Sequence, residues 1–193
     1  DGGEGGTGAA PMEYSNSVGM PLRDGLAFAI DCLNGFNLKK HIKIIASGKI
    51  LTGFDIIKNM CLGADMVNSA RGMMLALGCI QALDCNKNTC PTGVATQNPE
   101  LMKGLDIEDK GNRVAKYHRE TVNSVIDLLS ATGHESLNKL TRSDINKRIS
   151  EIEVKRFDEI YPEIKEGAFL SGDIPQKLTH EFTTADENKF LST

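Results

Sequence analysis

Apolar residues recur at helical spacing in two segments near the start of the chain. Between Pro21 and Gly35 the apolar positions are Leu22, Leu26, Ala29, Ile30 and Leu33. This spacing predicts a helix that begins at Pro21 and ends at Gly35. A second helix is predicted to begin at Thr52, because Asp55 three residues later favours a capping box, and Gly63 is its predicted stop.

Two short apolar runs predict strands beside these helices. Ile42–Ala46 is rich in β-branched residues and is followed by a Ser-Gly turn, and Ala64–Asn68 follows the second helix. Residues 20–78 are therefore predicted to run helix, strand, helix, strand, with parallel, buried strands. A (β/α)8 barrel uses roughly 30 residues for each unit, so these residues supply about two units. Two parallel strands cannot bury both faces of a sheet, so we expect the other strands upstream of Asp1.

The second half of the chain is less regular. Residues 79–99 hold three cysteines and two prolines in an irregular stretch, and a long helix with Tyr117 on its apolar side is predicted for residues 109–131. The last part of the chain is polar and favours short helical pieces. The sequence thus predicts an α/β fold with two parts, the strand-containing residues 1–100 and a helical extension, residues 101–193.

Composition and charge argue against several classes of protein. The 193 residues carry a net charge of −4 with scattered Lys and Arg, which argues against nucleic-acid binding. No apolar run approaches the ~18 residues needed to cross a bilayer, and no signal segment opens the chain. Five cysteines are an odd number for a secreted disulfide framework, so we expect either reduced thiols in a cytoplasmic protein or metal ligands. The opening at Asp1, inside a glycine-rich loop, suggests an excerpt of a longer chain.

The turns after the two predicted strands are candidate phosphate-binding loops. In (β/α)8 barrels the loops after the last two strands often hold a phosphate on backbone amides at a helix start. The first turn contains Gly48 and Lys49, and the second contains Ser69, Ala70 and Arg71. Gly48 lets the backbone approach closely, Ser69 has a hydroxyl to donate, and Arg71 offers a charged planar fork. Ordinary turns with a solvated arginine are the alternative.

Three cysteines close together in sequence form the second candidate site. Cys79, Cys85 and Cys90 are spaced C-x5-C-x4-C, with a proline after the last. Three thiolates suit a soft metal centre, and three ligands without a nearby histidine favour a three-iron cluster over structural zinc, which takes four. Buried thiols without a metal are the alternative. Cys32 and Cys61 lie on apolar helix faces and are predicted to be core residues.

Glycines crowd the opening loop, which contains Gly5, Gly6 and Thr7. Such a loop exposes successive backbone amides, which can bind a carboxylate or a phosphate or approach a flat ring. A flexible linker is the alternative interpretation.

Together these segments resemble the FMN-binding barrel of the glutamate synthase family. The resemblance covers residues 1–97 and includes Gly-Gly-Thr-Gly-Ala in the opening loop, the two turns and the three cysteines. Its most specific part is the cysteine spacing, which continues into Cys-Pro-x-Gly-Val-Ala-x-Gln. By this resemblance the fold is the carboxy-terminal portion of a (β/α)8 (TIM) barrel, followed by a cysteine-rich loop and carboxy-terminal helices.

The resemblance implies reduction of 2-iminoglutarate, formed from 2-oxoglutarate and ammonia, to L-glutamate, with FMN and a 3Fe-4S iron–sulfur cluster as cofactors. Glutamine supplies the ammonia in a separate domain, and ferredoxin or an NAD(P)H-linked partner supplies electrons. The residues implied around the FMN phosphate are Gly48, Lys49, Ser69, Ala70 and Arg71. The implied cluster ligands are Cys79, Cys85 and Cys90, and the implied border of the 2-oxoglutarate pocket is Gly5, Gly6 and Thr7. The flavin-facing basic residues of the family would lie upstream of Asp1, so no catalytic residue is assigned within this chain.

Two departures from the family pattern leave the substrate open. The opening loop inserts Glu4 and Gly5 into Asp-Gly-Gly-Thr-Gly, and the downstream half is similar to stand-alone FMN-binding glutamate synthase family proteins that lack the amidotransferase domain. A same-fold alternative is therefore a flavin oxidoreductase that reduces another imino acid or makes an N-substituted glutamate. An alternative of a different class is a non-catalytic scaffold in which the cysteines hold zinc.

Overall fold

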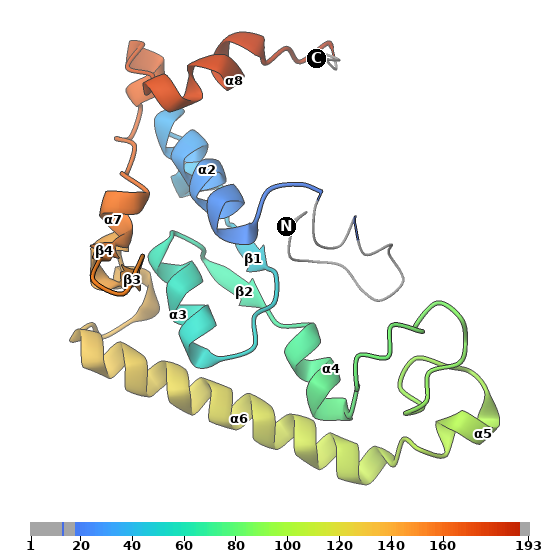
Figure 1. The fold of residues 1–193 in the computed structure, drawn as a ribbon. Helices are drawn as coiled ribbons and strands as arrows, with labels where there is room; N and C mark the ends of the chain where they lie inside the picture. Colours follow the sequence, from blue (N-terminus) through green and yellow to red (C-terminus); the bar gives the residue numbers. More distant parts are fainter. Residues whose placement is uncertain (1–12, 14–17, 190–193) are drawn as a thin grey trace.

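The computed structural model describes Glu13 and residues 18–189, and the first half of the chain alternates helices and strands (Figure 1). In chain order these elements are α2 (Leu22–Gly35), β1 (Ile45–Ser47), α3 (Gly53–Cys61), β2 (Met66–Asn68) and α4 (Arg71–Leu77). The predicted order of helix, strand, helix, strand for residues 20–78 is confirmed. The opening loop with the candidate residues Gly5, Gly6 and Thr7 lies outside the described residues.

Capping interactions set the limits of α3. The Thr52 hydroxyl accepts a hydrogen bond from the Asp55 amide (3.1 Å), and the Asp55 carboxylate accepts one from the Thr52 amide (3.0 Å). This reciprocal pair satisfies two amides that no helical carbonyl can reach. After the helix, Gly63 has a φ of +105°, a conformation that residues with a Cβ atom rarely adopt. The predicted capping box and the glycine stop are both confirmed.

β1 and β2 form a two-stranded parallel sheet in which Ile45 pairs with Met66 and Ser47 pairs with Asn68. This pairing confirms the predicted βαβ unit, because the connection between the strands passes through α3. The prediction that both strands are buried is wrong. Ala46 is 2% exposed, but Ile45 and Met66 are 52% and 51% exposed. Only one face packs on the core, and no third strand pairs with this sheet among the described residues.

The long helix α6 (Ile107–Thr132) packs against both α3 and α4, and the short helix α5 (Pro99–Met102) precedes it (Figure 1). Where α6 crosses α3, a Cβ atom at Gly53 would lie 2.7 Å from Ser124 Oγ and 2.9 Å from the Val125 amide nitrogen. Gly53 is therefore needed for this close crossing. The helix predicted for residues 109–131 is confirmed. None of the described helices is long and apolar enough to span a membrane.

The carboxy-terminal segment combines short helical turns with one hairpin. The hairpin joins β3 (Asn146–Arg148) to β4 (Val154–Arg156) in antiparallel pairing. The prediction of a helical extension is wrong for these residues, which form strands. The sequence did not indicate them, because they carry lysine and arginine and lack the alternating apolar residues typical of a strand. The α-helices of this segment are α7 (Phe157–Ile160) and α8 (Thr179–Thr184). The 3-10 helices of the described chain are Lys39–His41, Leu137–Lys139, Arg142–Asp144, Ala168–Ser171 and Gln176–Leu178.

The main hydrophobic core draws on both halves of the chain. Its buried residues are Leu22, Leu26, Ile30, Ala46, Ile50, Ile57, Met60, Cys61, Leu62, Ala64, Val125, Leu140, Ile145 and Phe157. A smaller cluster of Ile164, Ala168, Phe169 and Leu178 packs against Phe28 and Cys32 of α2. The prediction of a core residue is therefore confirmed for Cys61, whereas Cys32 is partly buried against the smaller cluster. The division into residues 1–100 and 101–193 stays a prediction. The main core includes residues from both parts.

A buried ion pair connects the carboxy-terminal segment to α2. Arg142 and Asp31 are 1% and 2% exposed, and Arg142 Nη2 lies 2.8 Å from Asp31 Oδ1. Arg142 Nη1 donates to the carbonyl oxygens of Tyr161 (2.8 Å) and Pro162 (3.4 Å). Lys177 Nζ lies 3.5 Å from Asp31 Oδ2. The guanidinium and the carboxylate thus compensate each other inside the protein, where an unpaired charge is costly.

Asp65 is expected to make the fold sensitive to acid. Burial alone raises the pKa of its carboxyl, but hydrogen bonds from Lys39 (2.7 Å), the Ile44 amide (2.8 Å) and Lys43 (3.1 Å) outweigh it and lower the pKa to about 2. A carboxyl whose pKa is lower in the folded state stabilises the fold above about pH 4, and this contribution is lost as the pH falls toward 2.

We expect the Asp65→Asn variant to lose on the order of 1–2 kcal/mol of stability at pH 7, a value reduced for the solvent screening of the exposed Lys43. Between about pH 4 and pH 2 the variant should lose less stability than the parent protein. Thermal unfolding of both proteins across this range measures the difference. An identical pH dependence in the two proteins would contradict this prediction.

Candidate functional site

The two predicted phosphate loops leave the same edge of the sheet. Because β1 and β2 are parallel and Ser47 pairs with Asn68, the carboxyl ends of the strands lie side by side. Residues 48–49 follow β1 directly, and residues 69–71 follow β2 and lead into α4. The structure therefore brings both candidate loops to one edge of the sheet, as the sequence predicts.

A hydroxyl hydrogen bond joins the two loops. Ser69 Oγ donates to the carbonyl oxygen of Ile50 at 2.6 Å. The sequence suggests that this hydroxyl donates to a phosphate, but its single hydrogen is committed to the loop after β1. Ser69 therefore holds one loop against the other.

The loop after β1 has a backbone conformation that needs support. Lys49 has a φ of +48°, in the left-handed region that residues with a side chain seldom occupy. Such a conformation costs on the order of 1 kcal/mol and persists only where the surrounding structure holds it. The Lys49 side chain is exposed, so its ammonium group is accessible to an anion.

The loop after β2 passes directly into α4, whose first residue is Arg71. The first amides of a helix have no carbonyl partner within the helix, and they favour an anion. Arg71 is half-buried at this position and adds a permanent positive charge. Amides and guanidinium together suit a phosphate group.

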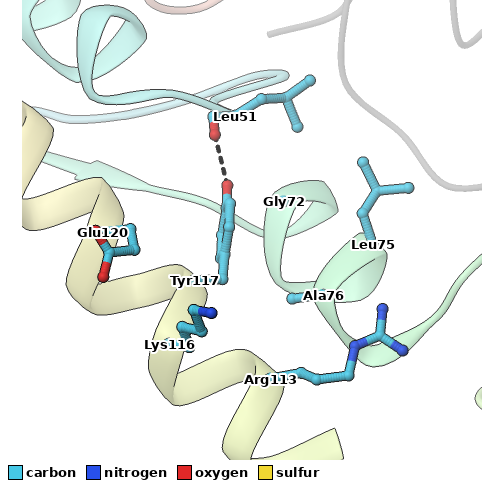
Figure 2. Close-up of a pocket in the computed structure, with 8 residues that line it drawn as sticks. All are labelled: Leu51, Gly72, Leu75, Ala76, Arg113, Lys116, Tyr117 and Glu120. Atoms are coloured by element: carbon cyan, nitrogen blue, oxygen red, sulfur yellow. Dashed lines mark hydrogen bonds between the residues drawn. The ribbon is translucent and has the colours of Figure 1, made fainter.

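Gly72 and Tyr117 bring α4 and α6 into close contact beside both loops (Figure 2). A methyl group at Gly72 would collide with the Tyr117 hydroxyl oxygen and would lie 2.7 Å from Ser69 Oγ. Tyr117 Oη donates to the carbonyl oxygen of Leu51 at 2.6 Å, as Figure 2 shows. Sequence reasoning placed Tyr117 only on the apolar side of a helix. Its hydrogen bond to Leu51, 66 residues away, depends on how α6 packs.

A cleft of about 580 Å³ opens between α4, α6 and the loop after β1 (Figure 2). Its lining combines apolar and charged side chains: Leu51, Gly72, Leu75, Ala76, Arg113, Lys116, Tyr117 and Glu120. The five residues predicted to surround a phosphate do not line it. A second cleft, of about 560 Å³, includes Asp65 and Met66 in its lining and so lies toward the amino-terminal end of β2.

The three cysteines of the predicted cluster occupy different environments. Cys79 follows α4 and is half-buried, Cys85 is exposed in a turn, and Cys90 is buried. No three Cys, His, Asp or Glu side chains in the described part of the chain are grouped so as to hold a metal ion. The described structure does not assemble these three sulfurs into a metal site, and the cluster assignment stays a prediction.

Cys90 nevertheless has the surroundings of a thiolate. Its sulfur lies 3.5 Å from the Thr92 hydroxyl oxygen. Hydrogen bonds from the Thr92 side chain and from the amides of Ala95, Thr92 and Val94 lower the pKa of the thiol to about 7, against the opposing effect of burial. The left-handed Gly93 (φ +75°) lies in this turn. Hydrogen bonds to sulfur are typical of cluster ligands, so the surroundings of Cys90 fit those of a cluster ligand.

A family model described as "Conserved region in glutamate synthase" matches residues 1–135. The chain belongs to the glutamate synthase family. The region that matches the glutamate synthase model contains both loops, the three cysteines and Tyr117, whereas Arg142 and the β3–β4 hairpin lie beyond it.

Individual members of the glutamate synthase family are similar to most of the chain. "Glutamate synthase large subunit-like protein YerD" of Bacillus subtilis is 46% identical over 136 residues, which cover 70% of this chain and 26% of YerD. "Archaeal glutamate synthase (NADPH)" of Methanocaldococcus jannaschii is 40% identical over 140 residues, 72% of this chain and 28% of that protein. "Glutamate synthase (NADH)" of Saccharomyces cerevisiae is 25% identical over 194 residues, 97% of this chain and 9% of that protein. The chain thus spans about a quarter of the length of the first two curated relatives.

Proposed function

We propose that this chain is the carboxy-terminal part of a (β/α)8 barrel that binds FMN, with β1 and β2 as its seventh and eighth strands. One observation carries the proposal: in a member of the glutamate synthase family, residues 48–49 and 69–71 adjoin each other at the carboxyl edge of two parallel strands. The exposed partners Ile45 and Met66 support further strands, because barrel strands are covered on both faces.

The groups of this chain that would hold the FMN phosphate are a glycine, helix amides and two cations. Gly48 allows close approach of the backbone, and the amides at the start of α4 donate hydrogen bonds. Lys49 and Arg71 would balance the negative charge of the phosphate, and the hydrogen bond from Ser69 to Ile50 holds the two loops together. FMN bound there would supply hydride transfer. By the same proposal, Gly5, Gly6 and Thr7 of the opening loop would border the 2-oxoglutarate pocket.

The proposed reaction is the reduction of 2-iminoglutarate, formed from 2-oxoglutarate and ammonia, to L-glutamate. The relatives are named glutamate synthases, and two of the names include NADPH or NADH, which supports an oxidoreductase that acts on CH–NH2 donors with an NAD(P)H-linked or ferredoxin electron source. A 3Fe-4S cluster on the three cysteines is supported by their spacing and by the surroundings of Cys90. In the described part of the chain, the three sulfurs do not form a group that could hold a metal ion.

The purified full-length protein tests this function directly. Flavin released on denaturation, bound iron, and oxidation of a reduced carrier that depends on 2-oxoglutarate and ammonia are the expected results. Flavin together with turnover of a different imino acid would support the same-fold alternative. Zinc without flavin would overturn the proposal in favour of a scaffold.

We expect the Arg71→Ala variant of the full-length protein to bind FMN more weakly. Loss of one charged partner of a phosphate costs about 1.5–3 kcal/mol, or roughly ten- to a hundredfold in affinity. Quenching of FMN fluorescence by the apoprotein measures the dissociation constant. Arg119→Ala is the matched control, because Arg119 is exposed on α6 and pairs only loosely with Glu120 (3.8 Å). Equal FMN affinity of the Arg71→Ala variant and the parent protein would remove Arg71 from the site.

A further inference from the structure

Tyr117 belongs to α6 and lies outside both loops of the proposed phosphate site. Its hydroxyl nevertheless contacts the segments that follow both strands. Its hydroxyl donates to the carbonyl oxygen of Leu51 at 2.6 Å, in the segment between β1 and α3. The same hydroxyl oxygen lies against Gly72 in the first turn of α4, where no side chain has room (Figure 2). One polar atom of α6 therefore contacts both segments that follow the strands.

Two neighbouring carbonyls of the loop after β1 are each held by a hydroxyl from another element. Ser69 Oγ donates to the Ile50 carbonyl and Tyr117 Oη donates to the Leu51 carbonyl, both at 2.6 Å. The Leu51 amide in turn donates to Asp55 Oδ2 at 3.1 Å. The peptide groups on both sides of Leu51 are thus fixed. This is the support that the left-handed backbone of Lys49 requires, two residues earlier.

The position of Tyr117 is itself fixed, because one face of α6 packs against both α3 and α4. α6 crosses α3 with Ser124 packed on Gly53, and it crosses α4 with Tyr117 packed on Gly72. Close packing at these two glycines fixes the position of α6 relative to both loops. The tyrosine ring is half-buried between these contacts.

We propose that Tyr117 is a positioning residue of the FMN site, whose hydroxyl holds the loop after β1 in the conformation that presents its backbone to the flavin phosphate. The hydrogen of Tyr117 Oη is committed to Leu51, so the residue acts through the loop and does not itself contact the phosphate. The inference rests on the proposed FMN site and adds to it a residue outside both loop motifs.

The Tyr117→Phe variant tests this inference, because it removes only the hydroxyl group. We expect FMN affinity of the full-length apoprotein to fall roughly three- to tenfold, the usual effect of losing one hydrogen bond. Riboflavin, which has the same ring system without the phosphate, should bind the variant and the parent protein equally. A purely structural role would weaken both ligands alike. Flavin fluorescence quenching measures both affinities.

Tyr161→Phe is the matched control, because it also removes one bonded hydroxyl, that of Tyr161 to Asp24 (2.8 Å), at α2. It should leave FMN affinity unchanged. Equal FMN affinity of the Tyr117→Phe variant and the parent protein, or an equal loss for FMN and riboflavin, would overturn the inference. The parent protein separates the two hypotheses: if it binds no FMN, the proposed function fails, whereas FMN binding that is insensitive to Tyr117→Phe defeats only the role of Tyr117.

Discussion

Replacing Arg142 by methionine is expected to destabilise the protein by about 3–5 kcal/mol, because it leaves the Asp31 carboxylate buried without its main partner. Arg142 is 1% exposed, and its guanidinium serves Asp31 and two carbonyl oxygens at once. Lys177 remains 3.5 Å from Asp31 Oδ2, but its side chain is 51% exposed and offers a weaker, screened interaction. A urea titration of the full-length protein measures the change in the free energy of unfolding.

Two companion variants show whether the ion pair is the cause. The double variant Asp31→Leu/Arg142→Met removes both charges and should recover much of the lost stability, because no unpaired charge remains in the core. Lys103→Ala breaks an exposed pair with Glu100 and should change stability by about 0.5 kcal/mol or less. A loss in the single Arg142 variant no larger than in Lys103→Ala would show that the buried pair contributes little.

Gly72→Ala is expected to disturb the fold and the proposed flavin site together. The added methyl group would collide with the Tyr117 hydroxyl and crowd Ser69 Oγ, and these two hydroxyls hold the loop after β1. Overpacking of this kind costs about 1–3 kcal/mol. Displacement of both hydrogen bonds should also lower FMN affinity at least as much as Tyr117→Phe does. Urea unfolding and flavin fluorescence quenching of the full-length protein measure the two effects.

A second substitution and a control test the steric cause. Tyr117→Phe in the Gly72→Ala background removes the colliding oxygen and should restore part of the lost stability, because the contact with Ser69 Oγ remains. Gly111→Ala is the control, because a Cβ atom at this helical glycine meets nothing within 4 Å. It should stabilise the protein by about 0.5–1 kcal/mol, since alanine favours a helix more than glycine does. Equal stability of Gly72→Ala and Gly111→Ala would contradict the predicted collision.

The elements of residues 20–78 could be predicted from the sequence because local interactions determine them. The capping box at Thr52 involves groups three residues apart, and the apolar spacing of α2 repeats within each turn. The parallel pairing of β1 and β2 follows from the intervening helix. Once the strands are parallel, the loops at residues 48–49 and 69–71 must share an edge. The location of the candidate phosphate site was therefore available from the sequence.

The burial of the strands, the β3–β4 hairpin and the positions of the cysteines could not be predicted from the sequence in the same way. The apolar residues Ile45 and Met66 predict buried strands, yet their exposure depends on which other strands cover the sheet. β3 and β4 pair through backbone hydrogen bonds although their side chains carry no strand pattern. The spacing of the cysteines predicts three converging ligands, but spacing alone does not set the path of the loop between Cys79 and Cys90.

By itself, the sequence determined the family, the order of the central helices and strands, and the loops in which phosphate chemistry is expected. Tertiary structure decided which groups hold those loops. Ser69 donates to Ile50, Tyr117 reaches Leu51 across 66 residues, and Arg142 pairs with Asp31 across 111 residues. Helices and turns depend on neighbours within a few residues, whereas these contacts exist only after distant elements have packed, so no local pattern encodes them.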